Sequence, residues 1–183
     1  NLLGFYNLVV KYIIRDHMKK IICIYIIFLS FNSFSQEIFE YEFDENISIN
    51  VIEDSDEGEI NDGKFIKGTY KDEIVIYSKS DKGKEQLKNI DDNGLVSFFK
   101  GLKDGTLKST NGVFISENEF TLDNVKIYSF RFSFKLKGKE KLVENFVFIY
   151  KDSTYTIQFM ADKDKFENNN EFRQSIIDSI KFN

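Results

Sequence analysis

An alternating aromatic segment late in the chain constrains the fold most strongly. Residues 128–136 place an aromatic or leucine side chain at every second position, with polar or charged residues between them. The apolar members are Tyr128, Phe130, Phe132, Phe134 and Leu136. Successive side chains of a strand point to opposite faces of a sheet, so this pattern predicts a long strand with one buried face. We favour a face packed under helices over the alternative, an aromatic wall of a hydrophobic ligand pocket.

The next apolar segment predicts that this sheet is covered on both sides. Residues 145–150 (NFVFIY) are apolar on both faces of a strand, which requires burial of both faces.

The acidic segment 53–63 contains glycine and asparagine and predicts a solvated turn. Further strands are predicted at residues 38–43, 47–51, 65–70, 73–78, 113–122 and 155–159.

Two segments have the spacing of amphipathic helices. The first begins at Asp92 as the N-cap and ends at Gly105. Its apolar residues are Leu95, Val96, Phe98, Phe99 and Leu102. In the second, Phe172, Ile176 and Ile180 form a stripe at i, i+4 and i+8 after a run of asparagines. The predicted fold class is therefore α+β, with a central antiparallel sheet flanked by helices in an α/β/α sandwich.

The N-terminal part of the sequence has the pattern of an export signal. The basic start at residues 18–20 (MKK) precedes an apolar run over residues 21–31. This run is shorter than the roughly 20 residues of a membrane-spanning helix. Ser33 and Ser35 fit a signal peptidase site. Cys23 lies near the start of the apolar run, whereas a lipid-modified cysteine would lie at its end.

These features predict three parts of the chain. We expect residues 1–17 to be an upstream extension without a fold and residues 18–35 to be a signal peptide, rather than an uncleaved anchor. Residues 36–183 are expected to form a single domain, because their length is sufficient for one hydrophobic core. The protein is then exported, periplasmic or extracellular, and has no integral membrane span after signal cleavage.

The charge and the residue inventory exclude several kinds of chemistry. The chain has a net charge of -5, and residues 1–36 contain four basic side chains and one acidic side chain. The remainder holds 21 basic and 29 acidic side chains, a net charge of -8. Nucleic acid binding requires clustered Lys and Arg, so this balance argues against it. His17 and Cys23 are the only residues of their types, which excludes Ser-His-Asp, Cys-His and ordinary zinc chemistry from the domain.

Three charged groups remain as candidate sites, and for each we favour solvated surface. The first is an acidic stretch whose oxygen ligands would suit calcium, but Gly58 stands where an EF-hand loop needs a ligand. Its members are Asp54, Asp56, Glu57 and Glu59. Asp162 and Asp164 form a second acidic pair without a loop glycine. The third is a basic hairpin with Lys135, Lys137, Lys139 and Lys141. We predict no catalytic, cofactor-binding or metal-binding residue.

The C-terminal half also carries a family resemblance. After the predicted meander strands, three segments come in a fixed order along the chain. They are the strand at residues 155–159 (YTIQF), the loop at residues 160–167 (MADKDKFE) and the helix end at residues 177–182 (IDSIKF). In this order the chain resembles the PsbP-like superfamily over roughly Phe43 to Phe182. That group includes the photosystem-II extrinsic protein, the Ran-binding nuclear import factor and bacterial envelope proteins of the DcrB type. The resemblance implies an α/β/α sandwich and a role in binding or assembly, and it transfers no functional residue.

We therefore expect a non-catalytic exported domain that binds a protein partner of the cell envelope and takes no cofactor. One alternative is a binder of a small hydrophobic ligand or lipid, which predicts a cavity beside residues 130–134. Another is a carboxylate-based hydrolase. It predicts two acids that converge in a pocket, one of them with a raised pKa.

Overall fold

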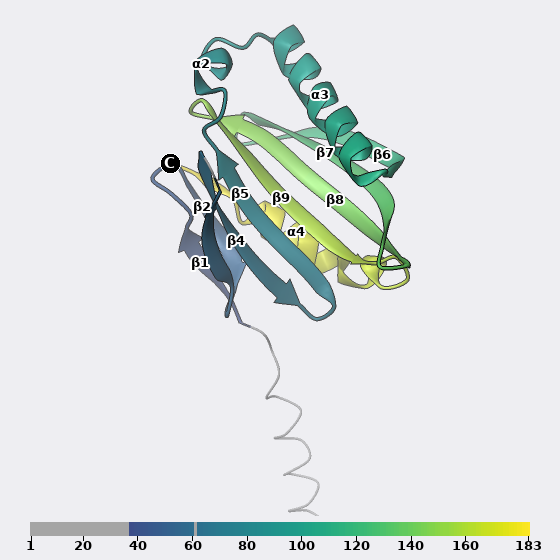
Figure 1. Ribbon diagram of the computed structural model, residues 1–183. Helices are drawn as coiled ribbons and strands as arrows, with labels where there is room; N and C mark the ends of the chain where they lie inside the picture. Colours follow the sequence, from purple (N-terminus) through teal and green to yellow (C-terminus); the bar gives the residue numbers. More distant parts are fainter. Residues whose placement is uncertain (1–36, 61) are drawn as a thin grey trace, which may run out of the picture. The chain divides into compact units, whose positions relative to one another are not determined.

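The aromatic segment forms the centre of strand β7 (Val125–Leu136), in a seven-stranded antiparallel sheet (Figure 1). The computed structural model describes residues 37–60 and 62–183. The predicted upstream extension (1–17) and signal peptide (18–35) lie outside the described residues. The strand order is β3 (Asp56–Ile60), β4 (Gly63–Tyr70), β5 (Glu73–Ser80), β9 (Ser153–Asp162), β8 (Lys139–Tyr150), β7 and β6 (Val113–Leu122).

Strands β7 and β8 form the long hairpin that the sequence predicts. Their register runs from Ile127 opposite Phe148 to Leu136 opposite Lys139. The turn is made by Lys137 and Gly138, whose φ angles are 50° and 80°. Two successive residues with positive φ match the right-handed twist of a tight hairpin, which explains the glycine at this position.

One face of the sheet is covered by helix α3 (Asp92–Thr110), which follows the short helix α2 (Lys84–Leu87). The N-cap is Asp91, one residue before the predicted cap, and its Oδ1 accepts a hydrogen bond from the backbone N–H of Gly94 at 2.7 Å. The predicted end at Gly105 is wrong, because that glycine is exposed and the helix continues through it. The helix ends at Asn111 with φ 50°.

The aromatic face of β7 packs under α3 as predicted. Phe130 and Phe132 are each 1% exposed, and the ring of Phe99 stacks on Tyr128 with ring centroids 5.1 Å apart. The buried cluster is completed by Val143 and Val147 of β8, and partly buried side chains of α3 surround it. Tyr128, Phe130 and Phe132 are therefore core, whereas Phe134 is partly buried and Leu136, predicted to lie on the same buried face, is 41% exposed.

The opposite face is covered by helix α4 and by a second sheet (Figure 1). Helix α4 (Asn170–Asp178) follows the 3-10 turn η1 (Phe166–Asn169). The second sheet has the order β1 (Ile38–Glu42), β2 (Ile47–Ile52) and β10 (Lys181–Phe182). Strand β10 was not predicted from the sequence, since only its pairing with β2 makes two residues a strand. With both faces of the large sheet covered, the α+β fold class is confirmed.

The predicted solvated turn at residues 53–63 is wrong, because strand β3 lies within it. In the β3–β4 register, Asp56 is opposite Lys67 and Glu59 is opposite Lys64. Opposite charges on facing strands stabilise a pairing that the local composition disfavours. Among the described residues, none of the helices has the length and apolar character needed to cross a membrane.

Candidate functional site

A polar cleft of about 420 Å³ opens on the α4 side of the large sheet. Its walls come from β6, β7 and β8 and from the first turns of α4. The uncharged polar residues in its wall are Ser116, Asn118, Ser129, Asn170 and Gln174. Phe120 and Phe146 supply apolar surface, and Arg131, Glu144 and Arg173 supply charges.

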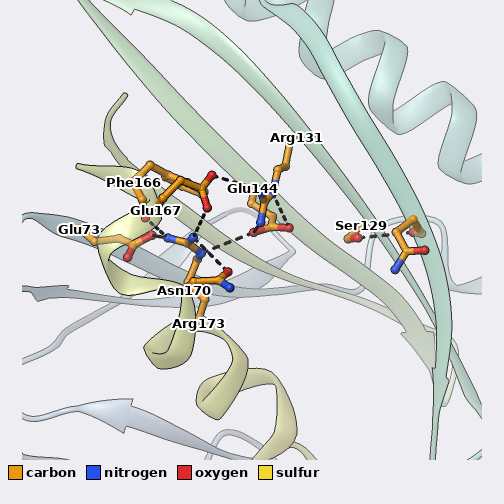
Figure 2. A network of polar contacts seen from close by, with 9 residues as sticks. Glu73, Ser129, Arg131, Glu144, Phe166, Glu167, Asn170 and Arg173 are labelled. Carbon is orange, nitrogen blue, oxygen red and sulfur yellow. Dashed lines mark hydrogen bonds and ion pairs between the residues drawn. The ribbon is translucent and has the colours of Figure 1, made fainter. Parts of the chain in front are cut away.

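Arg173 of helix α4 lines this cleft and is held in place by several polar contacts (Figure 2). Its side chain is 2% exposed, and Nη1 donates to Oε1 of Glu73 at 3.0 Å and to the carbonyl oxygen of Phe166 at 2.6 Å. The guanidinium also lies over the Phe166 ring, 3.8 Å from its centroid. Asn170, one helical turn earlier, accepts a hydrogen bond from Nη2 at 3.4 Å. These contacts join α4 to β5 and to η1.

Arg131 and Glu144 form the second part of the network (Figure 2). The two residues are directly opposite in the β7–β8 register, so their side chains share one face of the sheet. Nε of Arg131 lies 2.9 Å from Oε1 of Glu144, and Nη2 donates to Oε2 at 3.1 Å, which is a bidentate geometry. Oε2 of Glu144 is also 3.5 Å from Nε of Arg173. Glu144 therefore bridges the two arginines.

Glu167 completes the network from η1. Its carboxylate oxygens lie 3.3 Å from Nη1 of Arg131 and 3.9 Å from Nη2 of Arg173. Three carboxylates thus face two guanidinium groups. The network connects β5, β7, β8, η1 and α4, so it fixes the relative positions of the elements that form the cleft floor.

Burial and ion pairing have opposite effects on the pKa values of this network. Desolvation raises the pKa of Glu73, and the charge and hydrogen bond of Arg173 only partly oppose that effect. Burial acts to lower the pKa of Arg131, but the hydrogen bond and charge of Glu144 outweigh it and raise the pKa. Arg131 therefore stays charged, whereas Glu73 is the acid that is held nearer to its neutral form.

The network meets only part of the geometry that a carboxylate hydrolase requires. Glu73 and Glu144 do converge on Arg173, and one of them has a raised pKa. Glu73 is 0% exposed and does not line the cleft, so a bound molecule could not reach it. Both oxygens of Glu144 are held by Arg131. A general acid or base must reach the substrate, so neither Glu73 nor Glu144 is placed for proton transfer to a molecule in the cleft.

A second cleft, of about 520 Å³, lies on the α3 side of the sheet. It is bounded by Val96, Lys100 and Lys103 of α3, by Tyr128 of β7 and by residues 117–119 of β6. Glu117 forms an ion pair with Lys103 and accepts a hydrogen bond from the Tyr128 hydroxyl at 2.5 Å. These two hydrogen bonds lower the pKa of the Glu117 carboxyl. Strand β6 therefore stands between two clefts, one on each face of the sheet.

The aromatic ladder does not line the ligand cavity of the alternative hypothesis. Side chains of α3 fill the space over Phe130 and Phe132. On the α3 side, open space lies beyond this part of the ladder, in the second cleft at Tyr128 and in a hollow of about 350 Å³ at Phe134. Lysine, glutamate and asparagine side chains stand among the residues that bound these spaces, so neither is the apolar cavity beside residues 130–134 that the hypothesis predicts.

The charged groups singled out in the sequence lie outside the cleft. Glu57 accepts a hydrogen bond from the Tyr41 hydroxyl at 2.7 Å, on strand β3 at the far edge of the sheet. Asp162 binds Lys141 at 2.5 Å and lies 3.7 Å from Lys139 of the basic hairpin. In residues 37–60 and 62–183, no group of three or more His, Cys, Asp or Glu side chains is arranged to hold a metal ion.

The arginine network was not predicted from the sequence, although the composition carries a signal for it. Arg131 and Arg173 are the only arginines in residues 36–183, against 19 lysines. The planar guanidinium makes bidentate and stacked contacts that lysine cannot make. In a chain that otherwise uses lysine for its positive charges, two arginines indicate positions where that geometry is needed.

Comparison with known proteins identifies the fold. No model of a known protein family matches the sequence, and no curated protein sequence matches it either. The solution structure of cyanobacterial PsbP (CyanoP) from Synechocystis sp. PCC 6803 is similar with a TM-score of 0.57 and 8% identity. The similarity covers 82% of this chain and 95% of CyanoP.

Two further structures share the arrangement. The Ran-binding protein Mog1p of Saccharomyces cerevisiae has a TM-score of 0.51 and 10% identity, over 80% of this chain and 96% of Mog1p. PA94 of Pseudomonas aeruginosa, a protein of unknown function, has a TM-score of 0.53 and 5% identity, over 78% of this chain and 95% of PA94. The chain therefore has the PsbP-like fold that its sequence resembles. At these identities the similarity concerns the fold alone.

Proposed function

We propose that the chain is an exported, non-catalytic domain that binds a protein partner of the cell envelope at the two clefts beside strand β6. The observation that carries this proposal is the position of β6 between a polar cleft and a second, mixed cleft. A ridge with hollows on both sides offers shape and polar groups to another protein surface.

The chemistry of the clefts supports binding without catalysis. The Glu144 carboxylate in the wall of the polar cleft is engaged by two arginines, and the residues from 36 onward contain neither histidine nor cysteine. Preformed ion pairs hold the cleft walls in place, so a partner would meet a surface that needs little reorganisation. The fold of Mog1p, a Ran-binding protein, gives a precedent for protein recognition by this architecture.

The partner site can be tested by site-specific photo-cross-linking in the cells that produce the protein. A photoreactive side chain at Asn118, which is exposed and lines both clefts, should yield one discrete protein adduct. The control is the same side chain at Glu59, an exposed position of β3 at the opposite edge of the sheet. Equal adducts from both positions, or none from Asn118, would contradict the proposal.

Export has a separate test. The sequence from Met18 to Ser35 predicts that the mature protein begins at Gln36. N-terminal sequencing of the protein from the envelope or the culture medium should therefore start at Gln36. A protein that retains Met18 and remains in the cytosolic fraction would contradict export without affecting the partner site.

A further inference from the structure

Strand β6 is the long open edge of the large sheet. It has 10 residues and ends the strand order, so within the described residues its outer side pairs with no other strand. The other edge, β3, has five residues, three of which are acidic, and a short charged edge resists pairing. Strand β6 instead exposes Val113, Phe114 and Ile115, at 66%, 43% and 47%.

The bulge in β6 defines which part of the edge is regular. The register with β7 shifts between Phe114 and Ser116, and from Ser116 to Leu122 it continues without interruption. Along these seven consecutive residues, every second residue therefore directs its backbone N–H and C=O groups outward, away from β7. This length is typical of a strand in a globular protein.

A strand added beside β6 would have one cleft on each of its two faces. Glu117 and Glu119 are opposite Phe130 and Tyr128, so they lie on the α3 face. Asn118 and Phe120 lie on the other face, which borders the polar cleft. Because side chains of a strand alternate, an added strand would direct one set toward each cleft.

A second copy of this chain does not suit this edge. In the antiparallel register that overlaps all of residues 116–122, Glu119 would be opposite Glu119 of the other copy. A shift by two residues places Glu117 opposite Glu119. Like charges directly opposite each other destabilise a strand pair. The net charge of -8 over residues 37–183 adds to the repulsion.

We propose that β6 takes up an extended segment of the partner protein as an additional strand. The segment carries a basic side chain on the α3 face, opposite Glu119, and apolar side chains on the α4 face, beside Phe120 and Leu122. Charge complementarity at Glu119 points to this occupant, since β6 contains no basic residue and its other acid, Glu117, is already paired with Lys103. Glu119 has neither a hydrogen bond nor an ion pair within the described residues. Backbone pairing supplies affinity and the alternating side chains supply specificity. The inference rests on the proposed function.

The test uses a synthetic probe, because the partner is unidentified. The probe is a ten-residue peptide, capped at both ends, in which lysine and valine alternate. Hydrogen exchange of the protein is followed by mass spectrometry with and without the peptide at millimolar concentration. We expect slower exchange in residues 113–122 and unchanged exchange in residues 56–60. A peptide of the same composition with its lysines in one block should protect neither segment, which separates strand pairing from attraction to an acidic surface.

Two charge reversals complete the test. Glu119→Lys should weaken binding of the alternating peptide roughly fivefold, because one favourable cross-strand pair becomes repulsive. Glu59→Lys makes the same change on the other edge and should leave binding unaltered. Absence of protection in residues 113–122, or an equal effect of the two reversals, would overturn strand addition. The cross-linking result at Asn118 does not depend on the peptide, so protein binding and strand addition can fail separately.

Discussion

Replacement of Arg173 by methionine tests whether the buried network holds the cleft together. Arg173 is 2% exposed and its partner Glu73 is 0% exposed, with 3.0 Å between Nη1 and Oε1. Methionine fills a similar volume but leaves the Glu73 carboxylate buried without its main partner. Removal of one member of a buried ion pair costs about 3–5 kcal/mol. The lost hydrogen bond to the Phe166 carbonyl adds about 1 kcal/mol.

The loss of free energy of unfolding caused by Arg173→Met depends on pH in a defined direction. Burial already raises the pKa of Glu73, and the loss of Arg173 would raise it further. A carboxyl whose pKa is higher in the folded than in the unfolded state loses stabilising free energy as the pH rises between the two values. The deficit of Arg173→Met should therefore be largest near pH 7 and should shrink as the pH falls toward 4.5, the ordinary value of the group.

Urea unfolding of both proteins at pH 7 and pH 5 measures this effect. The control is the double variant Arg173→Met, Glu73→Leu, which removes both charges and should recover most of the lost free energy of unfolding. A deficit below about 1 kcal/mol at pH 7 would refute the argument, since breakage of a buried pair costs several times more. An equal deficit at the two pH values would refute the role assigned to Glu73.

Three further predictions concern other parts of the fold. Phe132→Ala should lower the free energy of unfolding by about 3–5 kcal/mol in denaturant titration, because this ring is buried under α3; an unchanged melting temperature would instead fit a ligand-lining ring. Asp44→Asn should cost about 1–3 kcal/mol at pH 7. Burial acts to raise the pKa of Asp44, but hydrogen bonds from Lys79, Tyr155 and the backbone outweigh it and lower the pKa. This stabilisation is lost as the pH falls through the folded-state pKa, so unfolding curves of the two proteins should converge in acid. Gly138→Ala should cost about 1 kcal/mol by thermal unfolding, since its φ is 80°.

Local patterns in the sequence predicted the large sheet because its strands carry their periodicity with them. The ladder from Tyr128 to Phe134 has a period of two, and burial of Phe130 and Phe132 follows from it. The same approach failed where partners distant in sequence decide the structure. Strand β3 is paired with β4, whose lysines lie opposite its acids, and β10 exists only beside β2. The end of α3 was misplaced because a glycine on an exposed helix face does not stop a helix whose next turns still pack.

The candidate site was harder to predict than the fold for the same reason. Arg173 and Glu73 are 100 positions apart, and an arginine on a short polar helix is most simply predicted to be exposed. Only the assembled sheet brings β5, β8 and η1 around this side chain. The two acidic stretches considered as candidate sites in the sequence lie on other surfaces, because clustered acids along a chain are usually solvated.

The arginine network also bears on how β6 could accept a partner strand. An apolar contact between α4 and the sheet would tolerate small shifts of the helix, whereas the buried bonds of Arg173 fix its direction as well as its distance. The bidentate bonds of Arg131 to Glu144 fix β7 against β8 in the same way. Strand β7, which carries Arg131, is hydrogen-bonded to β6 along its length. Because β7 is held in place, β6, the outermost strand next to it, is also restrained. An edge strand held in this way loses little conformational freedom when another strand pairs with it, so more of the free energy of the new backbone hydrogen bonds contributes to affinity.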